Sequence, residues 1–306
     1  MAASNGPSAD PRRFGAVVVL FYPDDQCIAR ANRLSEFMTC VVVDNTPAGE
    51  SIARVSMLNS RVLQVRNFAN LGIATAQNQG VAELLAQGIE FAFLFDQDSD
   101  APATLLQGLM EYAACLSAKS ENVALIGPAY FDARFGAVTP FVQFLPFRLR
   151  RIPPYGTSPV EVDFLISSGS CLNLKFWRDI GPMEDDLFID FVDVEWCLRA
   201  KRKGFRIVGL PWLVLTHSLG EQPVRLLNRP YPLHSPIRRY YQVRNLLVLL
   251  SRGDVSWIWK SREVLRLPVR VVIYVCKGGR SIRANASMVW RGIRDGFAGR
   301  LGPFRN

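Results

Sequence analysis

Two groups of carboxylates and one histidine are the residues of this chain whose types and spacing could support chemistry. The first group is Asp96 and Asp98, which follow the apolar run Phe91–Phe95 and are separated by a single residue, Gln97. Two carboxylates, supplemented by the phosphates of a substrate, are the usual way in which a protein holds Mg²⁺ or Mn²⁺. The alternative is an acidic, solvated turn that caps the next helix, because Asp-x-Asp is a common chance pattern. The first group therefore predicts either a metal site or a capping turn.

The second group contains Asp190, Asp193 and Glu195. Aromatic and aliphatic residues lie between the two aspartates, and apolar neighbours can tune the pKa of a carboxyl group toward that of a general base. The competing explanation is that acidic residues near the start of a helix stabilise it by about 0.3–1 kcal/mol. His217 ends a later apolar run. It is either a hydrogen-bonded residue at a strand end or part of a metal site with mixed carboxylate and imidazole ligands.

Alternating strands and helices must position these groups. The expected strands cover residues 14–21, 41–43, 62–65, 91–95, 123–126, 163–166 and 214–217. The expected helices begin after Pro23 and over residues 73–86, 104–118, 176–180 and 190–203. This alternation predicts an α/β fold built on a largely parallel, doubly wound sheet. Such sheets bind ligands at the carboxyl ends of their strands, which is where Asp96 and Asp98 stand.

Other polar or small residues also stand at the ends of the predicted strands. Asp44 could bond a nucleotide base or ribose, or could form an ordinary turn with Asn45. The small residues of the helix over 73–86 could let backbone amides approach a phosphate, or could serve only tight packing against the sheet. The run Ser167–Ser170 is likewise small enough for its backbone to come close to a bound group.

Residues 129–161 interrupt the alternation. They contain five prolines and a cluster of basic residues at Arg148, Arg150 and Arg151. We expect an insertion of loops or a hairpin here. Long irregular connections in a compact domain are usually functional. Substrate specificity could reside in this insertion.

Positive charge is concentrated at the end of the chain. Residues 221–306 hold 17 Lys and Arg against 4 Asp and Glu, a net charge of +13, whereas residues 1–220 hold 19 against 23. Aromatic and aliphatic residues are interleaved with these charges, as amphipathic helices on an anionic lipid surface require. Each basic residue near such a surface contributes on the order of 1 kcal/mol. A solvated basic surface on packed helices explains the same pattern equally well.

The expected location is the cytoplasm, with peripheral attachment to the inner face of the cytoplasmic membrane. Residues 1–13 contain no apolar segment of the kind that a secretory signal needs. The uncharged stretches are shorter than the roughly 20 residues of a spanning helix. Scattered cysteines without C-x-x-C spacing indicate buried free thiols in a reducing compartment; they are Cys27, Cys40, Cys115, Cys171, Cys197 and Cys276.

The order of these motifs resembles that of the family 2 glycosyltransferases with the GT-A fold, and within them the bacterial dTDP-rhamnosyltransferases. The resemblance covers residues 14–250. The matching stretches are residues 17–23, 43–45, 70–74, 78–80, 96–98, 164–169, 188–199 and 217–220. The Ser-Ser-Gly and Phe-Ile-Asp-Phe-Val-Asp stretches point to rhamnosyl transfer in particular. Transferases of this group act in O-antigen, cell-surface polysaccharide and rhamnolipid synthesis.

The resemblance implies a GT-A nucleotide-sugar-binding, Rossmann-like sheet with helices on both faces over residues 14–235, followed by a basic amphipathic helical extension over 236–306. It implies inverting, metal-dependent transfer of L-rhamnose from dTDP-L-rhamnose to a hydroxyl of a glycolipid or lipid-linked glycan at the inner membrane surface. The alternatives are a mono-rhamnolipid acceptor, as in rhamnolipid synthesis, or another nucleotide sugar as donor.

The resemblance also assigns roles to individual residues. Asp98 of the Asp-x-Asp motif, with Asp96 and His217, would hold Mg²⁺ or Mn²⁺. Asp193 would be the general base; many relatives have Glu-Asp where this chain has Val192-Asp193, so Asp190 could share the role. The donor-binding positions would be Tyr22, Asp44, Asn70, Gly72, Asn78, Asp96, Gln97, Ser168 and Arg244. Residues 238–241, with Arg244 and Asn245, would close over the diphosphate or contact the membrane.

Three other classes of protein compete with this interpretation. A phosphatase that uses Asp-x-Asp typically has its nucleophile at the end of the first strand, whereas here the pair follows the fourth. A nucleic-acid-binding protein would suit the basic end of the chain, but no zinc, helix-turn-helix or RNA-binding motif accompanies it. A membrane adaptor would need neither acidic group. We therefore expect a membrane and a nucleotide sugar as partners, and no nucleic acid.

Overall fold

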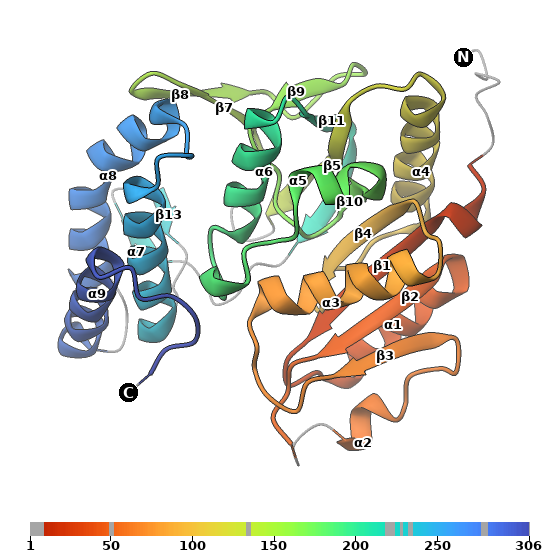
Figure 1. Ribbon diagram of the computed structural model, residues 1–306, viewed down its shortest axis with the longest axis horizontal. Coiled ribbons are helices and arrows are strands. Elements are labelled where there is room, and N and C mark those ends of the chain that lie inside the picture. The colour runs from red at the N-terminus through yellow and green to blue at the C-terminus, as the bar shows by residue number, and fades with distance from the viewer. Residues whose placement is uncertain are drawn as a thin grey trace.

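The computed structural model describes residues 9–48, 52–132, 136–217, 224–226, 229–231, 235–276 and 281–305. Its centre is a mixed sheet (Figure 1). In spatial order the strands are β3 (Val62–Arg66), β2 (Thr39–Asp44), β1 (Phe14–Leu20), β4 (Phe91–Asp96), β10 (Ser170–Asn173), β5 (Val123–Asp132), β11 (Arg206–His217) and β9 (Val160–Val162). Strands β3, β2, β1 and β4 are parallel, as are β5 and β11, whereas β10 and β9 run antiparallel to their neighbours.

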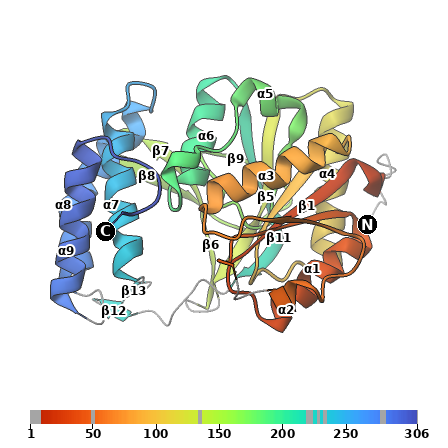
Figure 2. The same ribbon diagram turned by 60° about the horizontal axis from the view of Figure 1, so that its bottom comes forward.

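Helices cover both faces of this sheet (Figures 1 and 2). On one face lie α1 (Asp25–Phe37) and α4 (Ala103–Ala118), and on the other lie α3 (Ile73–Ala86), α5 (Trp177–Ile180) and α6 (Val192–Arg202). Alternate residues of β1 divide between the two layers, since Val18 packs with α1 and α4 while Val17 packs with α3 and α6. A strand buried on both faces needs an uninterrupted apolar run, as β1 has. The doubly wound α/β prediction is confirmed.

One predicted strand is wrong. Residues 164–166 are irregular, and the chain pairs only from Ser170 onward, in β10. The apolar run reflects burial, because Leu165 packs into the core without joining a ladder. The turn before β10 is fixed by Gly169, whose φ of 81° favours glycine and whose amide donates to the Leu94 carbonyl at 2.8 Å.

The insertion contains the expected hairpin. Strand β6 (Ala137–Thr139) pairs with β5, and β7 (Phe141–Leu145) pairs with β8 (Arg148–Ile152) in a separate two-stranded sheet. The register sets Val142 opposite Arg151 and Phe144 opposite Leu149. Because side chains alternate along a strand, these four share one face of the hairpin.

The C-terminal part packs as three helices beside the sheet, in blue in Figure 1. They are α7 (Pro236–Ser251), α8 (Trp257–Cys276) and α9 (Ile282–Phe297). Helix α9 lies close to α7 because Gly292 leaves room; a Cβ there would stand 2.7 Å from the Tyr240 carbonyl oxygen. The remaining elements are α2 (Ile52–Val55) and the pair β12 (Val224–Leu226) and β13 (Arg229–Tyr231), with single 3-10 turns at Pro11–Arg13, Leu174–Phe176 and Asp185–Leu187. None of the described helices has the length and apolarity to cross a membrane.

Candidate active site

The acidic ends of β2 and β4 stand on either side of β1 at the carboxyl edge of the sheet. The parallel register pairs Leu20 with Asp44 and Val19 with Asp96. Asp44 is buried, and its Oδ1 accepts a hydrogen bond of 2.9 Å from the Thr46 amide. The position predicted for both aspartates, at the ligand-binding edge of an α/β sheet, is thus the one they occupy.

The segment after β1 makes hydrogen bonds to the turn that follows Asp96 and to the turn that follows Asp44. The Phe21 amide donates to Gln97 Oε1 at 2.8 Å, and the Tyr22 amide donates to Thr46 Oγ1 at 2.9 Å. Tyr22 has a φ of 50°, and its side chain is 47% exposed. A left-handed backbone at a non-glycine residue persists only where its surroundings hold it, and such residues gather at functional sites. Tyr22 therefore presents its ring to solvent at this edge.

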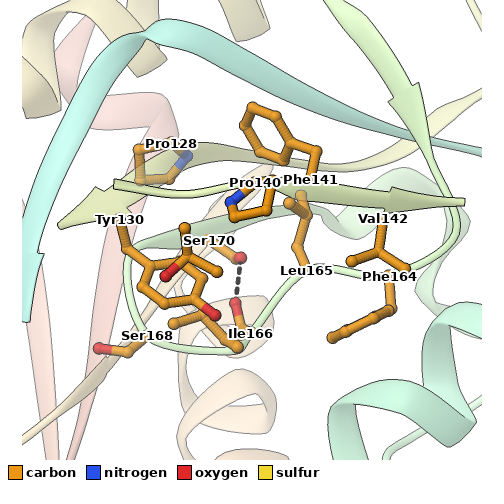
Figure 3. Close-up of a pocket in the computed structure, with 11 residues that line it drawn as sticks. Pro128, Tyr130, Pro140, Phe141, Val142, Phe164, Leu165, Ile166, Ser168 and Ser170 are labelled. Atoms are coloured by element: carbon orange, nitrogen blue, oxygen red, sulfur yellow. Dashed lines mark hydrogen bonds between the residues drawn. The ribbon is translucent and has the colours of Figure 1, made fainter. Parts of the chain in front are cut away.

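The Asp-x-Asp turn rests on Ser168. Asp98 is exposed and Asp96 is half-buried. The buried Ser168 hydroxyl accepts from the Asp96 amide at 3.4 Å and hydrogen-bonds the Ser99 hydroxyl. Ser168 thus fixes the backbone from which both carboxylates project, and it lines a small cavity of about 50 Å³ with Tyr130 and Phe164 (Figure 3).

The second acidic group lies on a strained loop before α6. Phe188, Asp190 and Phe191 have φ values of 67°, 63° and 65°. Asn245, on α7, holds this conformation, because its Nδ2 donates to the carbonyls of Leu187, Ile189 and Asp190 at 2.9, 2.8 and 3.0 Å. Asn245 was predicted, with Arg244, to close over the diphosphate or contact the membrane, and not to position this loop. Nothing in its local sequence signals this role, because the carbonyls it binds lie more than fifty residues away.

The two aspartates of this loop have different environments. Asp190 pairs with Arg238, with Nε and Nη2 each 3.1 Å from a carboxylate oxygen. Asp193 is half-buried at the start of α6. Burial, together with the charges of Asp190 and Asp96, raises the pKa of Asp193 to about 6, although the hydrogen bond from the Val194 amide lowers it. Charges interact measurably only over a short range in a solvated site. Because the charge of Asp96 helps to raise the pKa of Asp193, the two acidic groups belong to one site.

Arg244 does not take the donor-binding place predicted for it. The side chain is fully buried, and it donates to the carbonyls of Asp186 at 3.2 Å, Leu187 at 3.0 Å and Gly302 at 2.5 Å. The rings of Tyr240 and Tyr241, themselves buried, stack beside its guanidinium. Arg244, Tyr240 and Tyr241 thus connect α7 to the loop before α6, whereas a contact of the partly exposed Arg238 with a diphosphate or a membrane stays a prediction.

Asn70, Gly72 and Asn78 have structural roles, and the nucleotide contacts predicted for them stay predictions. Asn78 donates to Met183 O at 2.9 Å and Asp185 Oδ1 at 2.7 Å, and it accepts from the Met183 amide. Asn70 Oδ1 accepts from the Gly72 amide at 3.0 Å. A Cβ on Gly72 would stand 2.6 Å from the Phe188 carbonyl oxygen. Within α3, a Cβ on Gly80 would stand 2.3 Å from Val17 Cγ1, so this small residue serves close packing against β1.

The metal-binding prediction rests on two carboxylates. Within the described ranges no three His, Cys, Asp or Glu side chains gather as a metal cage. His217 ends β11, and its side chain lies outside the described part of the structure. Asp96 and the exposed Asp98 still fit a Mg²⁺ or Mn²⁺ ion of the kind that is completed by substrate phosphates and water.

The four buried cysteines of the described residues are unsuited to the chemistry of the site; Cys115 is half-buried, and the side chain of Cys276 lies outside the described residues. Cys27, Cys40, Cys171 and Cys197 are buried free thiols, as predicted, and burial raises the pKa of each. A thiol with a raised pKa is a poor nucleophile and a poor metal ligand at neutral pH. The chemistry therefore belongs to the carboxylates.

Comparison with known proteins identifies one relative in sequence and several structures with a similar fold. The chain shares 34% identity over 198 residues with dTDP-rhamnosyl transferase RfbF of Shigella flexneri, an alignment that covers 64% of this chain and 65% of that protein. GalNAc-T7, solved with UDP, GalNAc and Mn²⁺, superimposes with a TM-score of 0.57 at 13% identity, covering 91% of this chain and 54% of that one. The chain has the GT-A fold and is a relative of a bacterial rhamnosyltransferase.

A second GT-A structure agrees. TarS residues 1–349 of S. aureus, in complex with UDP-GlcNAc, gives a TM-score of 0.54 at 14% identity, covering 94% of this chain and 81% of that one. At these identities the structural likeness concerns the fold alone. No family model matches the chain, and the chain spans slightly less than two thirds of the length of RfbF. The family resemblance predicted from the motif order is confirmed.

Proposed function

We propose that the protein is an inverting glycosyltransferase that moves L-rhamnose from dTDP-L-rhamnose to a hydroxyl group of an amphiphilic acceptor. The identity to a dTDP-rhamnosyl transferase supports the donor. The observation that supports this type of reaction is the pKa of Asp193, which burial and the charge of Asp96 raise. One carboxylate suited to proton abstraction thus faces a pair suited to a diphosphate-bound metal.

The donor half of the proposed site is the carboxyl edge of β1, β2 and β4. Asp44 would accept hydrogen bonds from the nucleoside, and the exposed ring of Tyr22 would cover the base or ribose. Gln97 and Ser168 hold the turn from which Asp96 and Asp98 project. Mg²⁺ or Mn²⁺ bound to these carboxylates would stabilise the negative charge of the departing dTDP.

Asp193 is the proposed general base. As the acceptor oxygen forms its bond to the anomeric carbon, the carboxylate takes the hydroxyl proton, and the bond from that carbon to the diphosphate oxygen breaks. Attack from the face opposite the leaving group inverts the configuration. A base whose pKa lies near 6 is still ionised at neutral pH and is more basic than an ordinary aspartate. Asp190, neutralised by Arg238, is better suited to positioning than to proton transfer.

Peripheral attachment to an anionic membrane is part of the proposal. Helix α8 exposes Leu265, Val269 and Val272, spaced by about one helical turn, to solvent. Residues 221–306 carry a net charge of +13. An exposed apolar stripe flanked by arginines is the pattern of a helix that lies at a lipid surface.

The test is release of dTDP from dTDP-L-rhamnose by the purified protein, with Mg²⁺ or Mn²⁺ and with EDTA, beside UDP-glucose and GDP-mannose. We expect slow hydrolysis of the rhamnose donor alone, abolished by EDTA. Turnover of another donor would reassign the sugar. No turnover of any donor, without metal-dependent dTDP binding, would contradict the proposed activity. Trials with lipid-linked glycan and mono-rhamnolipid acceptors would then separate the two acceptor classes.

A further inference from the structure

A groove separate from the nucleotide edge lies between the β7–β8 hairpin and α8. Its volume is about 590 Å³, within the usual range of about 300–1,000 Å³ for small-molecule sites. Apolar side chains form most of its wall, among them Phe144, Phe164, Phe191, Val194 and Trp259. The hairpin contributes the face that carries Val142, Phe144, Leu149 and Arg151. The insertion in which specificity was expected to reside therefore builds one wall of a cavity.

The groove lies beside the segment that carries the proposed base. It is lined by Phe191 and Val194, which stand two residues before and one residue after Asp193 in the chain. Tyr130 and Phe164 are shared between the groove and the small cavity beside Ser168. Figure 3 labels Tyr130, Val142 and Phe164, which line both cavities, and Ser168, which lines the small one. A molecule in the groove would thus extend from α8 toward the acidic groups.

The groove also carries an excess of positive charge. Arg151, Arg262 and Arg270 line it together with one acid, Glu263. Glu263 is only 2% exposed and is shared by two of the arginines, with Arg270 Nη2 at 2.7 Å and Arg262 in direct contact. Three cations against one anion leave two positive charges for a ligand to balance.

Arg262 is the member that most needs an anionic partner. Its side chain is 13% exposed and lies over the Phe144 ring. Among the described residues, its Nε has no hydrogen-bond acceptor. Burial and the nearby charges of Arg266 and Arg270 lower the pKa of Arg262 to about 10, although Glu263 opposes this. A bound anion would relieve both the missing hydrogen bond and the repulsion.

We propose that this groove binds the acceptor, a phosphate-bearing amphiphile whose anionic group meets Arg151 and Arg262 and whose apolar chain lies against Phe144 and Trp259. The inference rests on the proposed transferase function, because it assumes that Asp193 acts on a hydroxyl of the occupant. A phosphate carries a charge of about −1.5 to −2 and three acceptor oxygens. It therefore balances the excess charge of the groove better than a single carboxylate does.

The test measures calorimetric binding of octyl phosphate, octanoate, octyl glucoside and inorganic phosphate, all below their micellar concentrations. We expect octyl phosphate to bind most tightly. Arg151→Gln and Arg262→Gln should each weaken it by about tenfold, since a charge-assisted hydrogen bond is lost. Arg150→Gln is the matched control, because this residue is on the same strand but on the opposite face of the hairpin, and it should leave binding unchanged.

Two results would overturn the proposal: equal binding of octyl phosphate and octyl glucoside, or equal losses in Arg150→Gln and Arg151→Gln. Tighter binding of octanoate would replace the phosphate with a carboxylate and contradict the assigned class. Because Arg151 is exposed, its variant tests the groove even if Arg262→Gln fails to fold. Donor hydrolysis measured in the same variants keeps the two proposals apart. It should be unchanged by Arg150→Gln, and its absence in the wild-type protein would contradict the transferase function without affecting amphiphile binding.

Discussion

Two features of its surroundings make Asp193 a suitable base. Burial raises its pKa, and the negative charge of the neighbouring Asp190 raises it as well. Arg238 neutralises Asp190, so the loop holds one paired and one basic carboxylate. This difference in environment separates two aspartates that are equivalent in the sequence pattern. The following predictions test it.

The rate of rhamnosyl transfer should depend on pH through Asp193. Because the protonated carboxyl cannot accept a proton, kcat/KM should fall as the pH drops through about 6. Asp190→Asn removes a charge that raises the pKa of Asp193, so this acid limb should move to lower pH. Glu111→Gln, an acid on α4 that hydrogen-bonds Gln107, should leave the limb in place. An acid limb near pH 4 in the wild-type enzyme would argue against Asp193 as the base.

Asp193→Asn should abolish transfer and leave dTDP binding intact. The same substitution should also stabilise the fold at neutral pH but not at acidic pH. The raised pKa means that ionisation costs stability in the folded state, so the wild-type protein loses stability as the pH rises from about 4 to about 6. Relative to wild type, Asp193→Asn should therefore melt at a higher temperature at pH 7.5 and at a similar temperature at pH 4. Thermal denaturation followed by circular dichroism measures both values. A lower melting temperature at pH 7.5 would show that the carboxylate stabilises the fold.

At the scale of elements, helix α7 determines the shape of the loop that presents the acidic residues. Asn245 donates to three carbonyls of that loop, whose backbone is left-handed at Phe188, Asp190 and Phe191. Asn245→Ala should cost about 3 kcal/mol of unfolding free energy, because buried carbonyls lose their donors. It should also lower kcat more than it raises the KM for the donor. Ser251→Ala, which removes one hydrogen bond within α7, is the control for urea denaturation. Equal losses in both variants would remove the role assigned to Asn245.

Helix α3 meets the same loop through Gly72. Gly72 and Gly88 both have positive φ values, 87° and 75°, but only a Cβ on Gly72 would contact the chain, at 2.6 Å from the Phe188 carbonyl oxygen. Gly88→Ala should cost about 1–2 kcal/mol from the left-handed backbone alone. Gly72→Ala should cost clearly more and should reduce transfer, because α3 or the loop must shift. Urea denaturation of the two variants compares them, and similar costs would mean that the close approach is unimportant.

At the scale of the whole molecule, the exposed stripe of α8 lies on a different side of the helix from Trp259 and Glu263, which line the groove. Leu265, Val269 and Val272 are 60%, 62% and 60% exposed, whereas Trp259 and Glu263 face inward. One helix would then contact a membrane on one side and the acceptor on the other. An amphiphile could pass from lipid to groove along the same element.

The double substitution Leu265→Glu, Val269→Glu should reduce co-sedimentation with phosphatidylglycerol vesicles at least severalfold, because both side chains would leave the lipid interface. Met57→Glu with Phe37→Glu alters two similarly exposed residues of the sheet domain and should not reduce it. Truncation from residue 254 is a poorer test. It removes the Gly302 carbonyl that binds Arg244 and the α9 glycines that pack on α7. Unchanged sedimentation of the α8 variant would contradict the membrane contact.

The sequence by itself determined the alternation of strands and helices, the strand ends that carry Asp44, Asp96 and Asp98, and the place of the insertion. Apolar periodicity and turn residues are local signals, and local signals place elements. Periodicity failed at residues 164–166, because an apolar run reports burial whether or not the backbone pairs.

Only the tertiary structure decided which side chains face the site. Arg244, Gly72 and Asn78 match the family pattern, yet their partners are carbonyls and side chains that are distant in the sequence. The pKa of Asp193, its difference from Asp190 and the charge of the groove likewise arise from groups on separate elements. Burial and electrostatic fields depend on distances in space, and one-dimensional spacing does not contain them.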